Sequence, residues 1–161
     1  MTIRSLRKNR KELRCQKETL ERAAEDKAEG KSPSTQAGEF VREEIEHIRE
    51  GKHGARSAKQ AIAIGLSKAR RAGVKLPPPE KGQASKRTRE QAKRDLKKGK
   101  KAAKKKPSAK RSRATLNALK REGHSAASKT ALSRQAHKAA AKRSAASRSR
   151  SAKKAAATRK K

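Results

Sequence analysis

The chain has 161 residues, of which 49 are Lys or Arg and 15 are Asp or Glu, so its formal net charge is +34. Only 17 residues are Leu, Ile, Val or Phe, and Trp and Tyr are absent. This composition argues against an ordinary enzyme core. It also excludes a base-stacking platform, which needs aromatic rings, and a membrane span, which needs about 20 consecutive apolar residues. We therefore expect neither enzymatic activity nor a membrane partner.

The positive charge is concentrated after the first 50 residues. Residues 1–50 contain 12 basic and 11 acidic residues, whereas residues 51–161 contain 37 basic and 4 acidic residues. A charge this one-sided opposes compaction unless a polyanion neutralises it. Nucleic acid is the predicted partner, and a tail that serves only solubility is the alternative.

Residues 1–30 are predicted to form a polar charged helix, which spans 3–29. Leucines recur every seven residues, but the other positions of that seam are charged, which favours a solvated single helix over a coiled-coil dimer. The seam consists of Leu6, Leu13 and Leu20, interrupted by Arg10 and Lys17. Residues 31–36 are interpreted as a linker. A role for 1–50 in binding a protein partner or in self-association remains open.

The compact part is predicted at 37–76, as a short helical hairpin. In the first helix, over 39–50, Val41, Ile45 and Ile48 share one face. The sequence from Ser57 to Gln60 is typical of a capping box that begins the second helix. Ile62, Leu66 and Ala69 give that helix its apolar face. The glutamates of the first helix are expected to pair with cations of the second.

The second helix is expected to end at Gly73 in the left-handed conformation, followed by Val74. Residues 77–84 are interpreted as a linker in which Gly82 carries no conformational demand. Residues 85–161 form a basic low-complexity tail. Within it, helices are expected over 85–98 and 113–122, and partial helix after 125.

The predicted fold class is therefore mostly α with extensive disorder: a polar N-terminal helix, a helical hairpin and a basic Ala/Lys/Ser-rich tail. Only Leu116, Leu119 and Leu132 are large apolar residues after Leu96. Because so few side chains cannot offset the entropy of ordering the chain, we expect the tail to be ordered only on nucleic acid.

No catalytic or metal-binding pattern is found in the sequence. It contains neither a GxSxG elbow nor a Walker phosphate loop. Glu43 and Glu44 are expected on a charged helix face rather than in a cleft. The single cysteine, Cys15, has no partner for an internal disulfide. No metal ion or cofactor is expected, and exposed polar positions are predicted for all four histidines: His47, His53, His124 and His137.

The candidate functional residues are cations that contact phosphates and release counterions, which gives affinity without base recognition. Most lie at the start of the tail, and three lie at the end of the hairpin. The tail set is Lys97, Lys98, Lys100, Lys101, Lys104, Lys105, Lys106, Lys110, Arg111 and Arg113. The hairpin set is Arg70, Arg71 and Lys75.

Two resemblances support this interpretation. KKAAKKKPSAKR at 100–111 resembles the tails of linker histones and of some histone-like bacterial nucleoid proteins. SAKQAIAIGLSKARRAG, from Ser57 to Gly73, resembles a motif of small basic bacterial proteins of unknown function, some labelled DNA-binding. That resemblance implies a bacterial DNA-binding protein without a known catalytic activity.

The leading hypothesis is a sequence-nonspecific DNA-binding protein, nucleoid-associated and histone-like, that acts by neutralising phosphates. Double-stranded DNA is the expected partner. One alternative is an RNA- or ribosome-associated protein, because ribosomal extensions share this aromatic-poor, basic composition. Another is an adaptor whose N-terminal region binds a protein. The N-terminus lacks the apolar stretch of a secretory signal, so we expect a cytoplasmic, nucleoid-associated protein.

Overall fold

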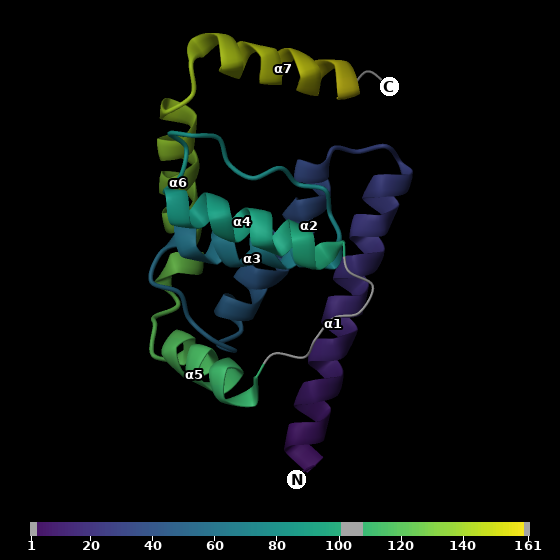
Figure 1. The fold of residues 1–161 in the computed structure, drawn as a ribbon, viewed down its shortest axis with the longest axis vertical. Helices are drawn as coiled ribbons and strands as arrows, with labels where there is room; N and C mark the ends of the chain where they lie inside the picture. The colour runs from purple at the N-terminus through teal and green to yellow at the C-terminus, as the bar shows by residue number, and fades with distance from the viewer. Residues whose placement is uncertain (1–2, 101–107, 160–161) are drawn as a thin grey trace.

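The computed structural model describes residues 3–100 and 108–159, and all of its regular elements are helical (Figure 1). The longer helices are α1 (Ile3–Ala28), α2 (Pro33–Arg49), α3 (Ala58–Ala72), α4 (Lys86–Gly99), α5 (Ala109–Lys120), α6 (Lys129–Ala141) and α7 (Ala145–Arg159). A single 3₁₀ turn, Ser125–Ala127, precedes α6. The predicted all-α class is confirmed, but the described residues do not show extensive disorder.

The segment interpreted as a linker at 31–36 is in fact the beginning of α2. The Ser32 side chain accepts a hydrogen bond from the backbone N–H of Thr35, and Pro33 occupies the first turn. Proline suits that position because its fixed φ is helical and its missing N–H would have no partner there. Pro33 was expected within a linker, whereas here it begins a helix.

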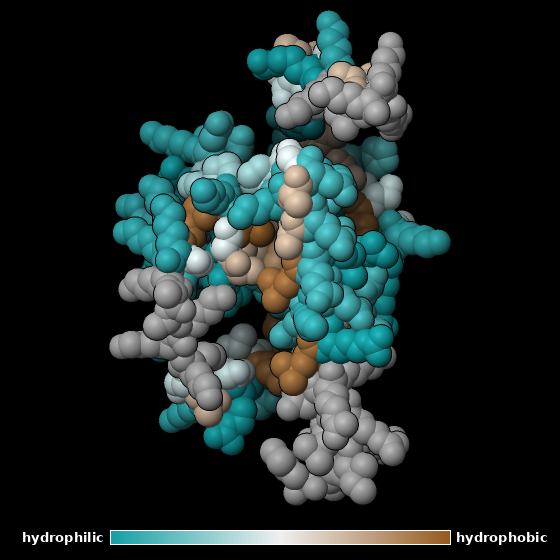
Figure 2. Space-filling model, turned by 90° about the vertical axis from the view of Figure 1, so that its right-hand side faces the viewer, coloured by the Kyte–Doolittle hydropathy of each residue, from teal (hydrophilic) through white to brown (hydrophobic). Residues whose placement is uncertain are grey.

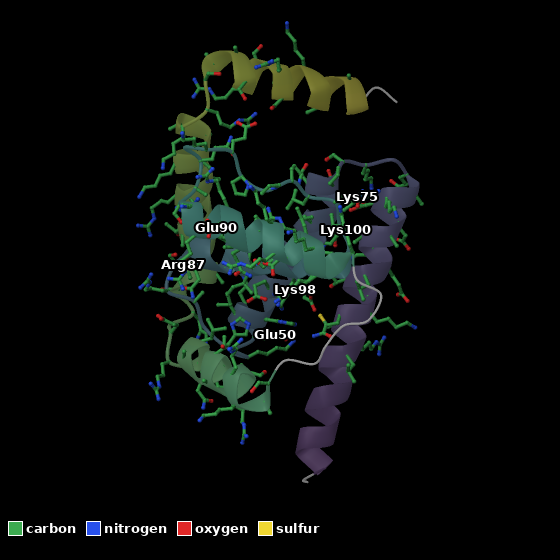
Figure 3. All side chains as sticks on the ribbon, viewed as in Figure 1. Glu50, Lys75, Arg87, Glu90, Lys98 and Lys100 are labelled. Atoms are coloured by element: carbon green, nitrogen blue, oxygen red, sulfur yellow. The ribbon has the colours of Figure 1, made fainter. Side chains whose placement is uncertain are left out.

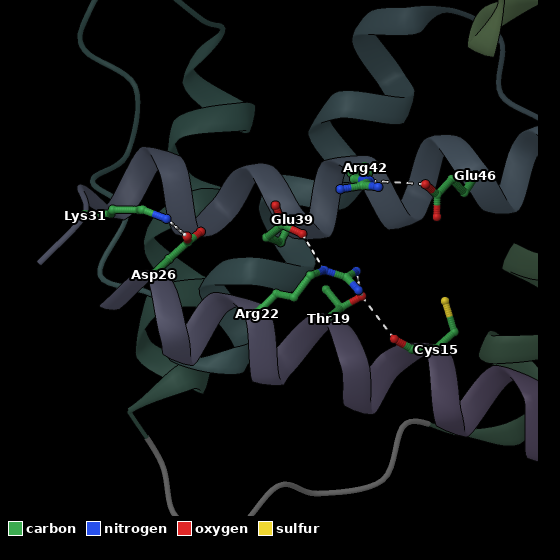
Figure 4. Close-up of polar contacts among 8 residues, drawn as sticks. All are labelled: Cys15, Thr19, Arg22, Asp26, Lys31, Glu39, Arg42 and Glu46. Atoms are coloured by element: carbon green, nitrogen blue, oxygen red, sulfur yellow. Dashed lines mark hydrogen bonds and ion pairs between the residues drawn. The ribbon is translucent and has the colours of Figure 1, made fainter. Parts of the chain in front are cut away.

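Helix α1 packs on α2 and is not the solvated single helix that the heptad pattern favoured. Thr19 and Ala23 are buried in the contact. Arg22 Nε lies 2.6 Å from Glu39 Oε2, and Lys31 Nζ lies 2.8 Å from Asp26 Oδ1 where the two helices are joined (Figure 4). Two leucines of the seam lie largely outside this contact, since Leu13 is 61% exposed and Leu20 48% exposed. Figure 2 views the α1 side of the molecule and shows hydrophobic residues between hydrophilic ones.

The predicted hairpin of α2 and α3 is present, and its caps are as expected. Ser57 accepts from the N–H of Gln60 at 3.2 Å. Gly73 has φ +105°, and the N–H of Val74 reaches the carbonyl of Ala69 at 3.1 Å. That is the 6→1 bond of a Schellman motif, which needs a left-handed residue at the helix end. Gly82 also has a positive φ, +94°, so the expectation that it carries no conformational demand is wrong.

The backbones of α2 and α3 approach closely where they cross. A Cβ at Gly65 would lie 2.6 Å from Val41 Cα and 3.0 Å from the Phe40 carbonyl oxygen. Lys68 Nζ of α3 lies 2.6 Å from Glu44 Oε2 of α2, an ion pair that the charge pattern predicted. Because Gly65 has no side chain, the crossing helices bury their small residues in direct contact.

Two parts of the predicted tail belong to the folded unit. The first is α4, which packs on α3 through Ala92 and Asp95. Gly99 at its end lies against the carbonyl of Arg70, where a Cβ would clash. The Asp95 carboxylate accepts from Gln91 Nε2 at 3.1 Å and lies 3.8 Å from Arg71 Nε. A domain boundary at residue 85 therefore does not describe this packing.

The second part is residues 119–127, which dock on the hairpin. The N–H of Gly54 donates to the Leu119 carbonyl at 2.9 Å, and Arg49 Nε donates to the Ala127 carbonyl at 3.0 Å. Ala126 and Ala127 join one hydrophobic cluster with Ile48, Ala55 and Ala61. The prediction of a disordered tail is wrong for this segment. Its order comes from alanines and backbone hydrogen bonds, which a count of large apolar residues does not register.

Residues 129–159 are more helical than the partial helix that was expected after 125. Helix α6 is capped by Ser128, whose hydroxyl accepts from the N–H of Ala131 at 3.2 Å. Helix α7 is different, because its described side chains are exposed except Ser147, which is half-buried. α6 therefore extends the folded unit, while α7 presents a basic surface to solvent.

We predict that Gly65→Ala destabilises the fold by about 1–3 kcal/mol, since the added methyl forces α2 and α3 apart. The matched control is Gly38→Ala on α2, where a Cβ would meet nothing within 4 Å. It should stabilise the fold by about 0.5–1 kcal/mol, because alanine is the better helix former. Urea unfolding followed by circular dichroism measures both changes. Equal stabilities for the two variants would contradict the close crossing.

We also predict that Ala127→Leu lowers stability by about 1–3 kcal/mol, because the site beside Ile48 has no room for the larger side chain. Ala136→Leu is the control, since Ala136 is exposed on α6 and the change there should stay within about 0.5 kcal/mol. Thermal unfolding of both variants gives the comparison. If Ala127→Leu melts with the wild type, residues 119–127 do not contribute to the core.

Candidate nucleic-acid interface

The outer surface of α4 is a row of cations. The helix turns Ala92, Asp95 and Gly99 toward α3. Arg89 and Leu96 are half-buried, and the other positions, which include the acid Glu90, face solvent. Figure 3 places Arg87 near the start of the helix and Lys98 and Lys100 at its end. The exposed cations are Lys86, Arg87, Lys93, Arg94, Lys97, Lys98 and Lys100. Only the last three of these cations were predicted as candidates from the sequence.

Arg70 differs from the other candidates, because it is buried and engaged within the fold. Its Nε donates to the Leu76 carbonyl at 3.2 Å, and its Nη2 donates to the Pro77 carbonyl at 3.1 Å. Burial lowers the pKa of Arg70, and the nearby Asp95 partly opposes this shift. Arg70 thus fixes the segment that follows α3 through the carbonyl groups of Leu76 and Pro77. The prediction that Arg70 is a phosphate contact is therefore wrong.

The other candidates are dispersed over several elements. Arg71 is about half exposed, and its Nε also donates to the Ser67 carbonyl. Lys75 is exposed beyond the end of α3. Three candidates are exposed on α5: Lys110, Arg111 and Arg113. Four lie outside the described residues: Lys101, Lys104, Lys105 and Lys106.

A groove that sequence reasoning missed lies where α3 and α6 begin. Two cations from the α3 side, Arg56 and Lys59, and two from α6, Arg134 and Lys138, line it. The other described residues of its lining include no acid: Ser57, Ala58, Ser125, Ala126, Ser128, Ala131 and Gln135. Four cations therefore converge on one concave surface.

The ends of two helices add to the positive potential of this groove. The first N–H groups of a helix have no acceptor within it, and the helix dipole places partial positive charge there. Ser57 and Ser128 each cap one such N–H group, at Gln60 and Ala131. A helix N-terminus of this kind is well suited to a phosphate. The cap at Ser57 was predictable, but α6 and its position beside α3 were not.

A second polar cluster is buried between α1, α2 and the loop that follows α2. It contains Cys15, Glu43, Glu44, His47 and His53. Glu43 and Glu44 are 2% and 0% exposed, and His47 is 3% exposed. The predictions that the acid pair occupies a charged surface and that His47 is exposed are therefore wrong. Glu43 and His47 are four residues apart and share a helix face, but nothing in the sequence links them to Cys15.

Burial dominates the ionisation of this cluster. It lowers the pKa of His47 to about 4, with Lys68 and Lys52 acting in the same direction. It raises the pKa of Glu43, against the opposing effect of Lys68. It also raises the pKa of the Cys15 thiol, and Glu43 adds to that shift. His47 is consequently a neutral imidazole near pH 7.

None of the helices within the described residues has the length and apolar character that a bilayer crossing requires.

Comparison with known proteins gives one family. Residues 26–81 match the sequence model of a family of unknown function (DUF6496), over about a third of the chain. The match spans α2, α3 and the loop after α3, and it includes the motif from Ser57 to Gly73. No curated protein and no solved structure matches the chain. The resemblance to proteins of unknown function is thus supported over 26–81, and the family description assigns no DNA-binding role.

Proposed function

We propose that this chain is a non-enzymatic protein that binds nucleic acid without sequence specificity by neutralising phosphates. Double-stranded DNA is the proposed target, in a nucleoid-associated, histone-like role. The observation that carries the proposal is the groove at the beginnings of α3 and α6, which combines four cations with two helix N-termini.

The groove supports phosphate binding because its attractive groups converge from two elements. Arg56 and Lys59 come from the α3 side, and Arg134 and Lys138 come from α6. With no described acid in the lining, a phosphate meets no local repulsion. Arginine forms bidentate hydrogen bonds to phosphate oxygens, and lysine contributes a compact charge.

The rest of the surface supports binding without base recognition. Exposed cations cover the outside of α4 and continue on α5 and α7. Side chains of this kind fix a protein on the phosphate backbone but carry no sequence information. Because the chain has no Trp or Tyr and a single Phe, Phe40, which is buried, base stacking is not a plausible source of affinity.

We predict a steep and sequence-independent salt dependence. If the chain contacts about 8–12 phosphates, the slope of log K against log salt should be roughly −7 to −11. The measurement titrates the full chain onto two duplexes of unrelated sequence at several salt concentrations. A slope near zero would argue against phosphate neutralisation, and a preference above about tenfold for one duplex would indicate base contacts.

A structured RNA of equal charge belongs in the same titration. If the RNA binds much more tightly than either duplex, the RNA- or ribosome-associated alternative replaces the DNA proposal. If no nucleic acid binds, an adaptor role for the N-terminal region becomes the better hypothesis.

The groove makes a separate prediction. Neutralising its four cations should weaken DNA binding more than neutralising four exposed cations elsewhere, because the groove brings its cations and two helix N-termini together on one concave surface. The groove variant is Arg56→Gln, Lys59→Gln, Arg134→Gln and Lys138→Gln. The matched variant is Lys142→Gln, Arg148→Gln, Arg150→Gln and Lys153→Gln, all exposed near the end of the chain.

Both variants change the net charge by the same amount, so each should reduce the magnitude of the salt slope by at most about 3–4. At fixed salt, however, the groove variant should lose at least about tenfold more affinity, which corresponds to about 1.4 kcal/mol. Equal losses would mean that net charge alone determines binding and that the groove has no special role.

A further inference from the structure

The buried cluster between α1 and α2 is not explained by nucleic-acid binding. We propose that Cys15, Glu43 and His47 form a binding site for one divalent transition-metal ion of the Zn²⁺ class. The ligand atoms are the Cys15 thiolate, a Glu43 carboxylate oxygen and His47 Nε2. This inference is independent of the proposed function.

The geometry of the three donors suits such an ion. Their ligand atoms all lie within 4.8 Å of one another, and His47 Nε2 is 3.7 Å from Glu43 Oε1. Tetrahedral coordination at ordinary Zn–N, Zn–O and Zn–S distances separates neighbouring donors by about 3.3–3.8 Å. Figure 4 shows the sulfur of Cys15 pointing from α1 toward α2, the helix that carries the other two donors.

Two of the donor atoms are also buried without a hydrogen-bond partner. Among the described residues, Glu43 Oε1 and His47 Nε2 are buried and have no hydrogen-bond partner. Such groups normally cost stability unless something satisfies them. The separation of 3.7 Å between these two atoms is too long for a hydrogen bond, but a cation between them would satisfy both.

The neighbouring acid is already compensated, which distinguishes it from Glu43. Glu44 Oε2 lies 2.6 Å from Lys68 Nζ, and Glu44 Oε1 lies 3.2 Å from His53 Nε2. A second grouping, of Glu44, His47 and His53, also has ligand atoms within 4.8 Å of one another. Because Lys68 occupies that side, we assign the ion to the side of Cys15.

The chemistry of the donor set points to zinc rather than calcium or magnesium. A thiolate and an imidazole are the ligands that zinc and related ions prefer, whereas calcium and magnesium prefer oxygen. One thiolate and one carboxylate balance the double charge of the ion once the Cys15 thiol has released its proton. Three protein ligands leave the fourth position of a tetrahedron to water.

Cobalt(II) is the probe, because it reports tetrahedral coordination and thiolate ligation by separate absorption bands. The full chain is freed of nucleic acid in high salt, reduced, and titrated with Co²⁺ and then with Zn²⁺. We expect an end point at one Co²⁺ per chain, with a thiolate-to-cobalt charge-transfer band that Zn²⁺ abolishes. Absence of that band at one equivalent would overturn the proposal.

Variants separate the assigned site from its neighbour. Cys15→Ser should remove the charge-transfer band and weaken Zn²⁺ binding at least tenfold, the low end of what losing a ligand or its support costs. His47→Gln should do the same. If the His47→Gln variant does not fold, the test rests on Cys15→Ser, because Cys15 is partly exposed and its replacement disturbs the fold less. His53→Asn and the exposed His137→Asn should keep the band and the affinity. If His53→Asn instead loses the ion while Cys15→Ser keeps it, the ion belongs to Glu44, His47 and His53, and the assignment is wrong.

Discussion

Gly65 sets the backbone of α3 directly against that of α2, and the other contacts of the molecule are arranged around this crossing. With the two backbones in contact, the small residues Ala61 and Ala69 of α3 are buried in the clusters that contain Ile48 and Phe40 of α2. The same principle recurs where Gly99 meets Arg70 and where Gly54 meets Glu122. A chain with few large apolar residues thus forms a core by bringing the backbones of neighbouring segments close together. Dense packing of small groups still supplies dispersion and excludes water.

The charges follow from the same arrangement. α2 lies between α1 and α3, so its acids face cations on both sides: Arg22 meets Glu39, and Lys68 meets Glu44. Most acids of the chain lie within residues 1–50, and a further one, Asp95, is buried at the contact between α3 and α4. The cations of α4, α5, α6 and α7 have few acids left to pair with. These cations therefore repel one another at the surface, and a bound polyanion would reduce that repulsion.

Local signals in the sequence predicted several of the elements, whereas contacts between distant residues could not be predicted from it. The cap at Ser57, the turn at Gly73 and the helix of 85–98 each depend on neighbouring residues, and each could be recognised. The docking of Ala127 on Ile48 depends on alanine, which also occurs throughout exposed helices, so its burial had no distinguishing pattern. Arg70 looked like a surface cation because nothing local reveals that it binds two carbonyl groups. Cys15 and His47 come together only because α1 folds back on α2.

The two proposed binding properties differ in their response to salt, which allows them to be examined in one protein. Phosphate binding depends on exposed cations and counterion release, so its affinity falls steeply as salt is raised. The metal ion would be held by ligand bonds rather than by counterion release, so the positive surface makes no comparable contribution to the salt dependence of its affinity. Added salt screens the remaining repulsion between that surface and an approaching cation. An ion at Cys15, Glu43 and His47 would tie α1 to α2, on elements other than those that line the groove. Holding α1 in place and binding a polyanion are therefore separable properties of the same fold.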